Sequence, residues 1–242
     1  MRGGQMLLGT ELVKPLEFRA FEEEGYARGF KCVAGTDEVG RGPLAGPVVA
    51  AAVILPRGFS HPEIKDSKLL TPKQRERVAP LIRNNAESWG LGVVGVEEID
   101  RINILKASLL AMVKALDCLK ARPDCLLIDG NQRIPRELIL TSQYFGRRSL
   151  YQKTIIKGDL LCLSIAAASI IAKVARDEMM VELDKQYPEY GFAAHKGYAC
   201  AAHLEALRRH GPSPIHRQSF QPVPDWAVTA DIIAAVVDDE CE

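Results

Sequence analysis

A glycine-rich turn between two apolar runs is the feature that most constrains how this chain can fold. The run before the turn, residues 31–39, ends in the adjacent acids Asp37 and Glu38, and the run after it covers residues 48–55. The second run is almost entirely Val, Ala, Ile and Leu, the composition of a strand covered on both faces. The pattern therefore predicts two strands joined by a sharp turn that lies against a buried sheet.

The two acids before this turn are candidates for a metal site. Side chains alternate across a strand, so both acids point the same way only if the strand bends, and Gly40 and Gly42 permit a bend just beyond them. Carboxylates beside backbone NH groups that glycine leaves accessible suit a metal ion and a phosphate. A surface turn with two solvated acids is the alternative, and the flanking apolar runs disfavour it. A Walker A loop is excluded because no Lys-Ser or Lys-Thr follows, and the glycine spacing GxGxxxG differs from the GxGxxG of dinucleotide sites.

The rest of the chain contains further strand-like and helical segments. Strands are predicted at residues 89–96, 125–128 and 154–156. Helices are predicted within residues 8–28 and at residues 71–85, 97–120, 160–187, 201–210 and 226–237. Three consecutive strands, followed by strands that alternate with helices, indicate an α/β fold with a mixed five-stranded sheet and helices on its faces.

Three of the predicted strands lead directly into acids. Asp37 and Glu38 end the first strand, Asp129 follows the fourth and Asp159 follows the fifth. Mg²⁺ and Mn²⁺ prefer carboxylate oxygens, and two-metal phosphoryl hydrolysis needs several carboxylates around ions roughly 3.5–4 Å apart. Alone, Asp129 could initiate a turn and Asp159 could cap the following helix. Their recurrence at strand ends of one sheet favours a metal site.

The basic residues gather in clusters although the whole chain has a formal net charge of zero. Five acids and no Lys or Arg lie in residues 231–242, which leaves a net charge of +5 on residues 1–230. The basic clusters lie within residues 73–77, 147–157, 195–196 and 208–217. Each alone is typical of a solvated face, but around a carboxylate site they could bind a phosphate backbone.

Composition predicts a cytoplasmic protein that does not enter a membrane. The chain has 242 residues, of which 47% are hydrophobic, enough for one large domain with or without a helical appendage. No apolar run reaches the roughly 18 residues that span a bilayer, and the first thirty residues lack the apolar region of a signal peptide. The six cysteines form no CxxC pair and indicate reduced core thiols.

Seven motifs follow one another along the chain, across about residues 16–220. They read TDEVGRGPLAGPVVAAAVIL, DSKLL, LLIDGN, IIKGD, SIAAASIIAKVARDE, YGFAAHKGY and PIHRQSF. In this order they resemble the motifs of ribonuclease HII, the bacterial type 2 ribonuclease H. The resemblance implies a ribonuclease H-like sheet with additional C-terminal helices. It divides the chain into a partly helical N-terminal extension (1–30), a catalytic domain (31–220) and an acidic, partly helical tail (221–242).

The resemblance also implies site residues. It implies four catalytic acids that hold two Mg²⁺ or Mn²⁺ ions: Asp37, Glu38, Asp129 and Asp159. The substrate-binding residues expected are Gly40, Arg41, Gly42, Lys196 and Tyr198. The backbone of the Gly-Arg-Gly segment would read the ribonucleotide 2′-OH, the group that separates RNA from DNA at a site. Tyr198 would stack on the sugar of the next deoxynucleotide, and a half-buried structural tyrosine is the alternative.

The expected substrates are RNA–DNA hybrids and duplex DNA that contains ribonucleotides. By resemblance, a monomeric endoribonuclease would cut on the 5′ side of the ribonucleotide, leave 5′-phosphate and 3′-hydroxyl ends, and serve ribonucleotide excision repair. A non-catalytic hybrid-binding protein of the same fold is the alternative. It is disfavoured because a binder gains nothing from four mutually repelling carboxylates.

Two further features qualify the resemblance. Type 3 ribonuclease H has a related fold but usually an added N-terminal substrate-binding domain, and only some thirty residues precede the first predicted strand here. Residues 136–150 look like an inserted loop, in which residues 144–148 could touch nucleic acid or form a surface excursion. Asp177 lies within a predicted helix and is interpreted either as a structural residue or as one that supports a site residue without contacting the metal itself.

Overall fold

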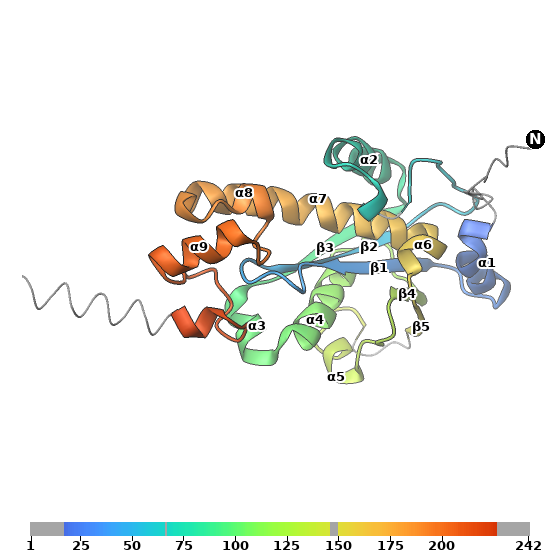
Figure 1. Ribbon diagram of the computed structural model, residues 1–242. Coiled ribbons are helices and arrows are strands. Elements are labelled where there is room, and N and C mark those ends of the chain that lie inside the picture. Colours follow the sequence, from blue (N-terminus) through green and yellow to red (C-terminus); the bar gives the residue numbers. More distant parts are fainter. Residues whose placement is uncertain (1–16, 66, 146–149, 227–242) are drawn as a thin grey trace, which may run out of the picture.

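The fold is built around a five-stranded mixed sheet (Figure 1). The computed structural model describes residues 17–65, 67–145 and 150–226. The strands are β1 (Val33–Val39), β2 (Val48–Ile54), β3 (Ser88–Val94), β4 (Cys125–Asp129) and β5 (Tyr151–Ile155). Their order is β3-β2-β1-β4-β5, with β1, β2 and β3 antiparallel and β4 and β5 parallel to β1. The predicted α/β fold is thus confirmed, although β5 begins three residues before the predicted strand.

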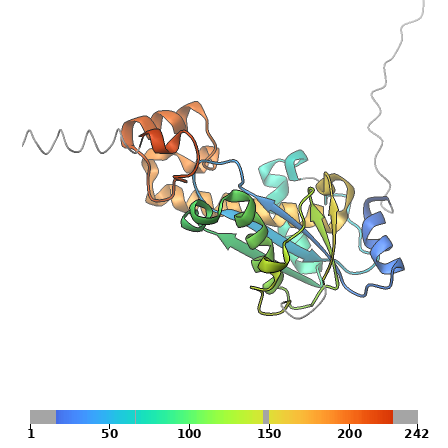
Figure 2. The same ribbon diagram turned by 90° about the horizontal axis from the view of Figure 1, so that it is seen from below.

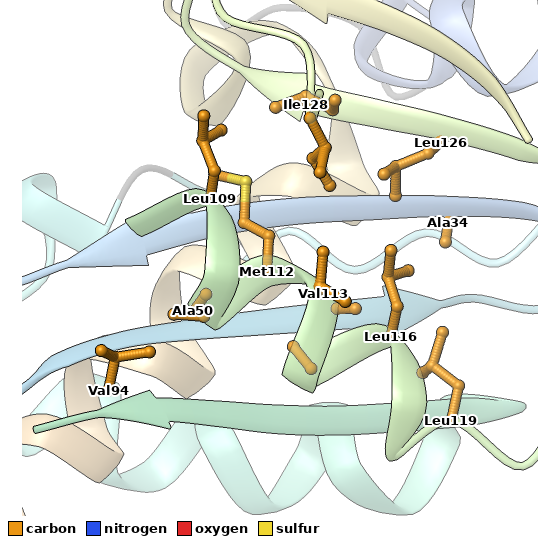
Figure 3. Packing of buried hydrophobic residues seen from close by; sticks show 14 of the residues in the cluster. Ala34, Ala50, Val94, Leu109, Met112, Val113, Leu116, Leu119, Leu126 and Ile128 are labelled. Atoms are coloured by element: carbon orange, nitrogen blue, oxygen red, sulfur yellow. The ribbon is translucent and has the colours of Figure 1, made fainter. Parts of the chain in front are cut away.

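Helices cover both faces of the sheet. One face of the sheet packs against α7 (Leu163–Gln186), and α2 (Pro72–Asn85) lies on the outer side of α7 (Figure 1). The other face packs against α4 (Ile104–Asp117). Figure 3 shows Met112 and Leu116 of α4 beside the alanines of β1 and β2. Alternate residues of β2 face the two helical layers, and all of them are buried, as its apolar composition predicts. The sheet is therefore a central layer between two cores.

Two predicted helices are interrupted. Residues 97–120 form α3 (Val96–Ile102) and α4, separated by Asn103 with φ 70°. Asparagine tolerates this left-handed conformation, and the Asn103 side chain caps α4 by accepting a hydrogen bond from Lys106 N at 3.1 Å. The apolar spacing continues across this break, so periodicity alone predicted one helix.

The predicted helix 160–187 is likewise divided, into α6 (Gly158–Leu161) and α7, at the extended residue Cys162. Glu22 of α1 (Ala20–Ala27) lies against this break, and its carboxylate accepts a hydrogen bond from Ser164 N at 2.8 Å. A carboxylate at a helix N-terminus satisfies free NH groups and complements the helix dipole. The N-terminal helix therefore fixes the start of α7.

The helices outside the central layers lie at opposite ends of the sheet. Figures 1 and 2 show α1 at one end, and α8 (Phe192–His195) and α9 (Ala201–His210) at the other. Of the predicted helix 226–237 only Trp226 lies within the described residues, and residues 1–16 also lie outside them. No helix in the described part of the chain is long and apolar enough to cross a membrane. The domain boundaries at residues 30 and 220 stay predictions.

The segment predicted as an inserted loop is partly ordered into the fold. It contains the short helix α5 (Arg136–Ile139), and Phe145 is buried in the core beneath α4. Tyr144 packs against the guanidinium of Arg122. Residues 146–149, the other part of the proposed nucleic-acid contact, lie outside the described residues.

Candidate active site and metal centre

The sheet register brings two of the predicted acids side by side. Thr36 of β1 pairs with Ile128 of β4, so Asp37 and Asp129 are the next residues on adjacent parallel strands. Both therefore point to the same face of the sheet, the face that α7 covers. Asp37 is only 6% exposed, and the Ser169 hydroxyl of α7 donates a hydrogen bond to it. Two chain segments that lie far apart in sequence thus place carboxylates together.

The side chain of Glu38, the next residue of β1, points toward the opposite face of the sheet. The ladder between β1 and β2 stays regular through Val39, so the strand is not bent at the two acids and their side chains alternate between the faces of the sheet. Glu38 forms an ion pair with Arg41, with 3.1 Å between Oε1 and Nη1. Its charge is nevertheless close enough to Asp37 to affect the ionisation of that group.

Asp159 joins the cluster from the start of α6. Its Oδ2 lies 2.8 Å from Nζ of Lys68, and Asp129 Oδ1 accepts a hydrogen bond from Gly158 N at 2.7 Å. Ile155, the last residue of β5, pairs with Asp129, so the chain turns from β5 into α6 beside that acid. The four predicted acids therefore lie around one region at the ends of three strands.

Burial and mutual repulsion disfavour the charged forms of these acids. Burial raises the pKa of Asp37 well above its ordinary value, and the charges of Glu38 and Asp129 raise it further. Burial also raises the pKa of Glu38, although the Arg41 guanidinium opposes the rise. The pKa of Asp129 is raised by burial and then by the charge of Asp159. A divalent cation would stabilise this set of carboxylates.

The donor set fits hard divalent cations, although the side chains do not form a closed cage. Among the described residues, no three Asp, Glu, His or Cys groups converge closely enough to hold one ion between them. Glu38 and Asp159 are instead paired with Arg41 and Lys68, whereas no described side chain forms an ion pair with Asp37. All-oxygen donors on neighbouring strand ends are the ligands that Mg²⁺ and Mn²⁺ prefer.

Lys68 is a site residue that the sequence reasoning did not single out, although it lies within the DSKLL motif. It belongs to a 3₁₀ turn (Ser67–Leu69) anchored by a hydrogen bond of 2.9 Å between the hydroxyls of Ser67 and Ser169. Arg75 Nη1 donates to the carbonyl of Ser67 at 2.9 Å, which further fixes the turn. Asp177 forms ion pairs with Lys173 and Arg75, which agrees with its interpretation as a structural residue.

Two buried arginines hold the glycine-rich turn. Arg217 belongs to the basic cluster 208–217 for which phosphate-backbone binding was considered, but it is fully buried, and Arg176 was assigned no role. Arg217 donates to the carbonyls of Gly40 at 2.6 Å, Arg41 at 3.1 Å and Gly46 at 2.8 Å. Arg176 of α7 donates to the carbonyls of Pro47 at 3.0 Å and Ala45 at 3.2 Å. Burial lowers the pKa of both guanidiniums, that of Arg217 to about 9. Both lie in the quoted motifs, but no local pattern shows that they are buried.

The turn itself needs glycine at position 40. Gly40 has φ 94°, and a Cβ placed there would lie 2.2 Å from Nε of Arg176. Gly42 differs, because its backbone is not left-handed and an added Cβ would only touch Cε1 of Tyr198 at 3.7 Å. The turn is therefore packed tightly at its start and open at its middle.

The segment with Lys196 and Tyr198 lies against this turn. Leu44 N donates to the Gly197 carbonyl at 2.8 Å, and Arg176 Nη1 donates to the Lys196 carbonyl at 3.0 Å. Tyr198 is 44% exposed, which is compatible both with a ring that contacts the substrate and with the half-buried structural tyrosine of the alternative. Lys196 Nζ donates to the carbonyl of Ala193 on its own segment. The structure therefore brings Tyr198 beside Gly42, whereas the Lys196 ammonium is turned back to α8.

Known proteins with similar sequences share one description. The family model described as Ribonuclease HII matches residues 34–223. The Ribonuclease HII of Geobacter sulfurreducens is 52% identical over 203 residues, covering 84% of this chain and 88% of that protein. The Ribonuclease HII of Chlamydia caviae is 53% identical over 204 residues, covering 84% of this chain and 90% of the relative.

Solved structures show the same fold. The ribonuclease H2 of Pyrococcus horikoshii has a TM-score of 0.67 and 27% identity, covering 83% of this chain and 99% of that one. The RNase HII in a complex with PCNA from Archaeoglobus fulgidus has a TM-score of 0.60 and 27% identity, covering 79% and 96%. A Bst-RNase HIII solved with Mn²⁺ shares the fold at a TM-score of 0.59 and 22% identity.

Proposed function

Because this chain belongs to the ribonuclease HII family and is a type 2 ribonuclease H, we propose that it hydrolyses RNA in RNA–DNA hybrids and incises duplex DNA on the 5′ side of embedded ribonucleotides. The products carry 5′-phosphate and 3′-hydroxyl ends. The proposed enzyme is a cytoplasmic monomer that acts in ribonucleotide excision repair. The family model and the relatives above 50% identity favour this activity over that of type 3 ribonuclease H.

The observation that carries the proposal is the position of Asp37 and Asp129 on adjacent parallel strands, each one residue beyond the pair Thr36–Ile128, with Glu38 and Asp159 close by. In the proposed enzyme these four acids hold two Mg²⁺ or Mn²⁺ ions, which when bound supply an activated water and Lewis-acid stabilisation of the leaving oxygen. The carboxylates would hold these ions at the edge of the sheet where β1 and β4 lie side by side. Arg41 and Lys68 neutralise two of the acids in the protein by itself.

Recognition of the ribonucleotide is assigned to the glycine-rich turn. Arg217 and Arg176 hold several carbonyls of the turn from beneath, and residue 42 has no side chain to block close approach of a sugar. Backbone groups that contact the 2′-OH distinguish RNA from DNA. Tyr198, exposed beside Gly42, offers a ring on which the next sugar can stack. Lys196 is a proposed substrate contact whose ammonium must first leave Ala193.

Cleavage of three matched duplexes tests the function. With Mg²⁺ or Mn²⁺, a duplex with one embedded ribonucleotide and an RNA–DNA hybrid should be cut, and an all-DNA duplex of the same sequence should stay intact. Gel mapping of the labelled strand should place the cut on the 5′ side of the ribonucleotide with a 3′-hydroxyl end. Binding of both RNA-containing duplexes without any incision would instead identify the protein as a hybrid binder.

The substitution Gly42→Ala should damage cleavage without harming the fold. The added methyl group makes only an ordinary contact with Tyr198. In the proposed mode of recognition, it would also stand between the ribose and the backbone groups that contact the 2′-OH. We expect incision of the single-ribonucleotide duplex to fall about tenfold or more, since roughly 1.4 kcal/mol of lost contact corresponds to a factor of ten. The melting temperature should stay within about 2 °C of the parent, because ordinary surface changes cost at most about 0.5 kcal/mol. Unchanged incision would remove Gly42 from the recognition surface.

Divalent ions should stabilise the folded protein through the acid cluster. Mg²⁺ or Mn²⁺ at about 100 times its dissociation constant contributes about 2.7 kcal/mol. That corresponds to a rise of roughly 5–10 °C in melting temperature for a chain of this size. In Asp37→Asn the rise should shrink, and the metal-free variant should be at least as stable as the parent because repulsion is relieved. An equal rise in both proteins would show that the ions bind elsewhere. Ca²⁺ should also stabilise the parent but support little cleavage, because its geometry is looser.

A further inference from the structure

A cluster of buried histidines lies behind Tyr198, away from the acids. His203 of α9 and His216 are both buried, and His195, at the end of α8, stacks on His203 with 4.5 Å between ring centroids. The rings of Tyr190 and Phe192 cover His216. Nothing in the proposed chemistry uses these imidazoles, although imidazole is rarely buried without a hydrogen-bonding reason.

The hydrogen bonds fix the tautomer of each ring in the cluster. Ser213 N–H donates to Nδ1 of His216 at 2.9 Å, so this nitrogen is an acceptor and the neutral ring carries its proton on Nε2. That Nε2–H donates to Nε2 of His203, 3.0 Å away. The proton of His203 is therefore on Nδ1, which donates to the carbonyl of Tyr198 at 2.9 Å. Only one direction of donation satisfies all three contacts.

The same logic holds for His195, whose bonds fix the residue before Tyr198. Gly197 N–H donates to its Nδ1 at 3.2 Å, and its Nε2 donates to the carbonyl of Tyr190 at 2.8 Å. Burial lowers the pKa of His203 and lowers that of His216 to about 3. Both rings are therefore neutral near pH 7, as the chain of hydrogen bonds requires.

The chain of imidazoles ends at the residues that would meet the substrate. His216 donates a hydrogen bond to His203, which in turn donates to the carbonyl of Tyr198. Arg217, which follows His216 in the sequence, donates to the carbonyls of Gly40 and Arg41. One short segment thus fixes both sides of the contact between Tyr198 and the glycine-rich turn. Cys200 N also donates to the Tyr198 carbonyl, at 2.9 Å, so that carbonyl accepts two hydrogen bonds.

We propose that His203 and His216 are positioning residues, which through a directed chain of hydrogen bonds between neutral imidazoles hold Tyr198 in the orientation that stacks on the nucleic acid. The inference rests on the role proposed above for Tyr198. It adds that this role depends on a donor at Nδ1 of residue 203. Loss of this donor should leave the catalytic acids in place and lower the affinity for the substrate.

Two polar substitutions of His203 separate positioning from structural support. His203→Asn places an amide near the Nδ1 position and keeps a donor for the Tyr198 carbonyl, but loses the partner of His216. His203→Gln reaches toward the Nε2 position, keeps the partner of His216, and loses the donor to Tyr198. His203→Asn leaves the Nε2–H of His216 without an acceptor, whereas in His203→Gln the Tyr198 carbonyl keeps its hydrogen bond from Cys200 N, so His203→Asn should lose at least as much melting temperature. A merely structural histidine would therefore give kinetic effects in His203→Asn at least as large as those in His203→Gln.

The measurement is kcat and KM for the duplex with one embedded ribonucleotide, in Mg²⁺. We expect His203→Gln to raise KM about tenfold with kcat within about threefold of the parent, because a Tyr198 ring that is no longer held in place loses part of its contact with the substrate, and a factor of ten corresponds to about 1.4 kcal/mol. His203→Asn should stay within about threefold of the parent in both parameters. If both variants raise KM equally, or if His203→Asn has the larger effect, the proposal is overturned.

The Tyr198→Ala background supplies the second test. There His203→Gln should raise KM no further, because contacts that act through one residue are not additive. A full tenfold effect in that background would overturn the positioning role. If Tyr198→Ala itself leaves KM unchanged, the role proposed for Tyr198 is wrong, and the inference that rests on it falls as well. Absence of incision by the parent would instead reject the proposed function.

Discussion

The substitution Asp129→Asn should lower the rate of incision in Mg²⁺ about a thousandfold or more. Asparagine keeps the shape of the side chain, and its oxygen can still accept the hydrogen bond from Gly158 N. What is lost is one negative charge beside Asp37, at the centre of the proposed metal site. Metal ions supply several kcal/mol of transition-state stabilisation, and about 1.36 kcal/mol corresponds to each factor of ten. Single-turnover cleavage of the duplex with one ribonucleotide measures the effect.

The same strand supplies a matched control. Asp124 lies directly before the other end of β4, where its carboxylate accepts hydrogen bonds from Lys31 N and Cys32 N. Asp124→Asn makes the same chemical change next to the opposite end of β4, away from the acid cluster, so its rate should stay within about threefold of the parent. Near-parent incision by Asp129→Asn would remove Asp129 from the metal site. Equal losses in both variants would assign the effect to the strand instead.

The substitution Arg217→Ala should have the largest effect on stability of the changes considered. The guanidinium is fully buried, and its removal leaves the carbonyls of Gly40 and Gly46 without their donor. Each buried unpaired polar group costs about 1–3 kcal/mol, and a cavity adds to this. We expect a loss of about 4 kcal/mol, or roughly 10 °C in melting temperature. Incision should also fall, because the glycine-rich turn loses its support.

A second basic residue gives the comparison. Arg208 on α9 is exposed and forms its ion pair with Glu205, the only partner among the described residues, so Arg208→Ala should change stability by no more than about 0.5 kcal/mol. Arg217→Lys keeps the positive charge, but it replaces the planar guanidinium, which donates to several carbonyls at once, with a compact ammonium group. Its melting temperature should therefore lie between those of the parent and Arg217→Ala. A melting temperature of Arg217→Ala within about 2 °C of the parent would contradict this prediction. It would show that water molecules replace the hydrogen bonds of the guanidinium without loss of stability.

The sequence by itself determined the strands and the acids that end them. A run such as residues 48–55 is buried on both faces in the structure, as its composition predicts. The positions of Asp37, Glu38, Asp129 and Asp159 follow from where apolar runs stop, which is local information. Adjacent parallel strands then bring such residues together at one edge of the sheet, and the register of β1 and β4 does this for Asp37 and Asp129.

The tertiary structure alone decided how these parts are held. Periodicity did not show the helix breaks at Asn103 and Cys162, because a capping side chain sets the first and Glu22, 142 residues before Ser164, lies against the second. The donors that fix the glycine-rich turn come from Arg217, up to 177 residues away along the chain. Arginine is usually exposed and histidine has no strong preference, so only the packing of α7, α9 and the turn shows that here they are buried and oriented by backbone carbonyls. Hydrogen bonds between such distant residues depend on the whole fold, and no local pattern of residues encodes them.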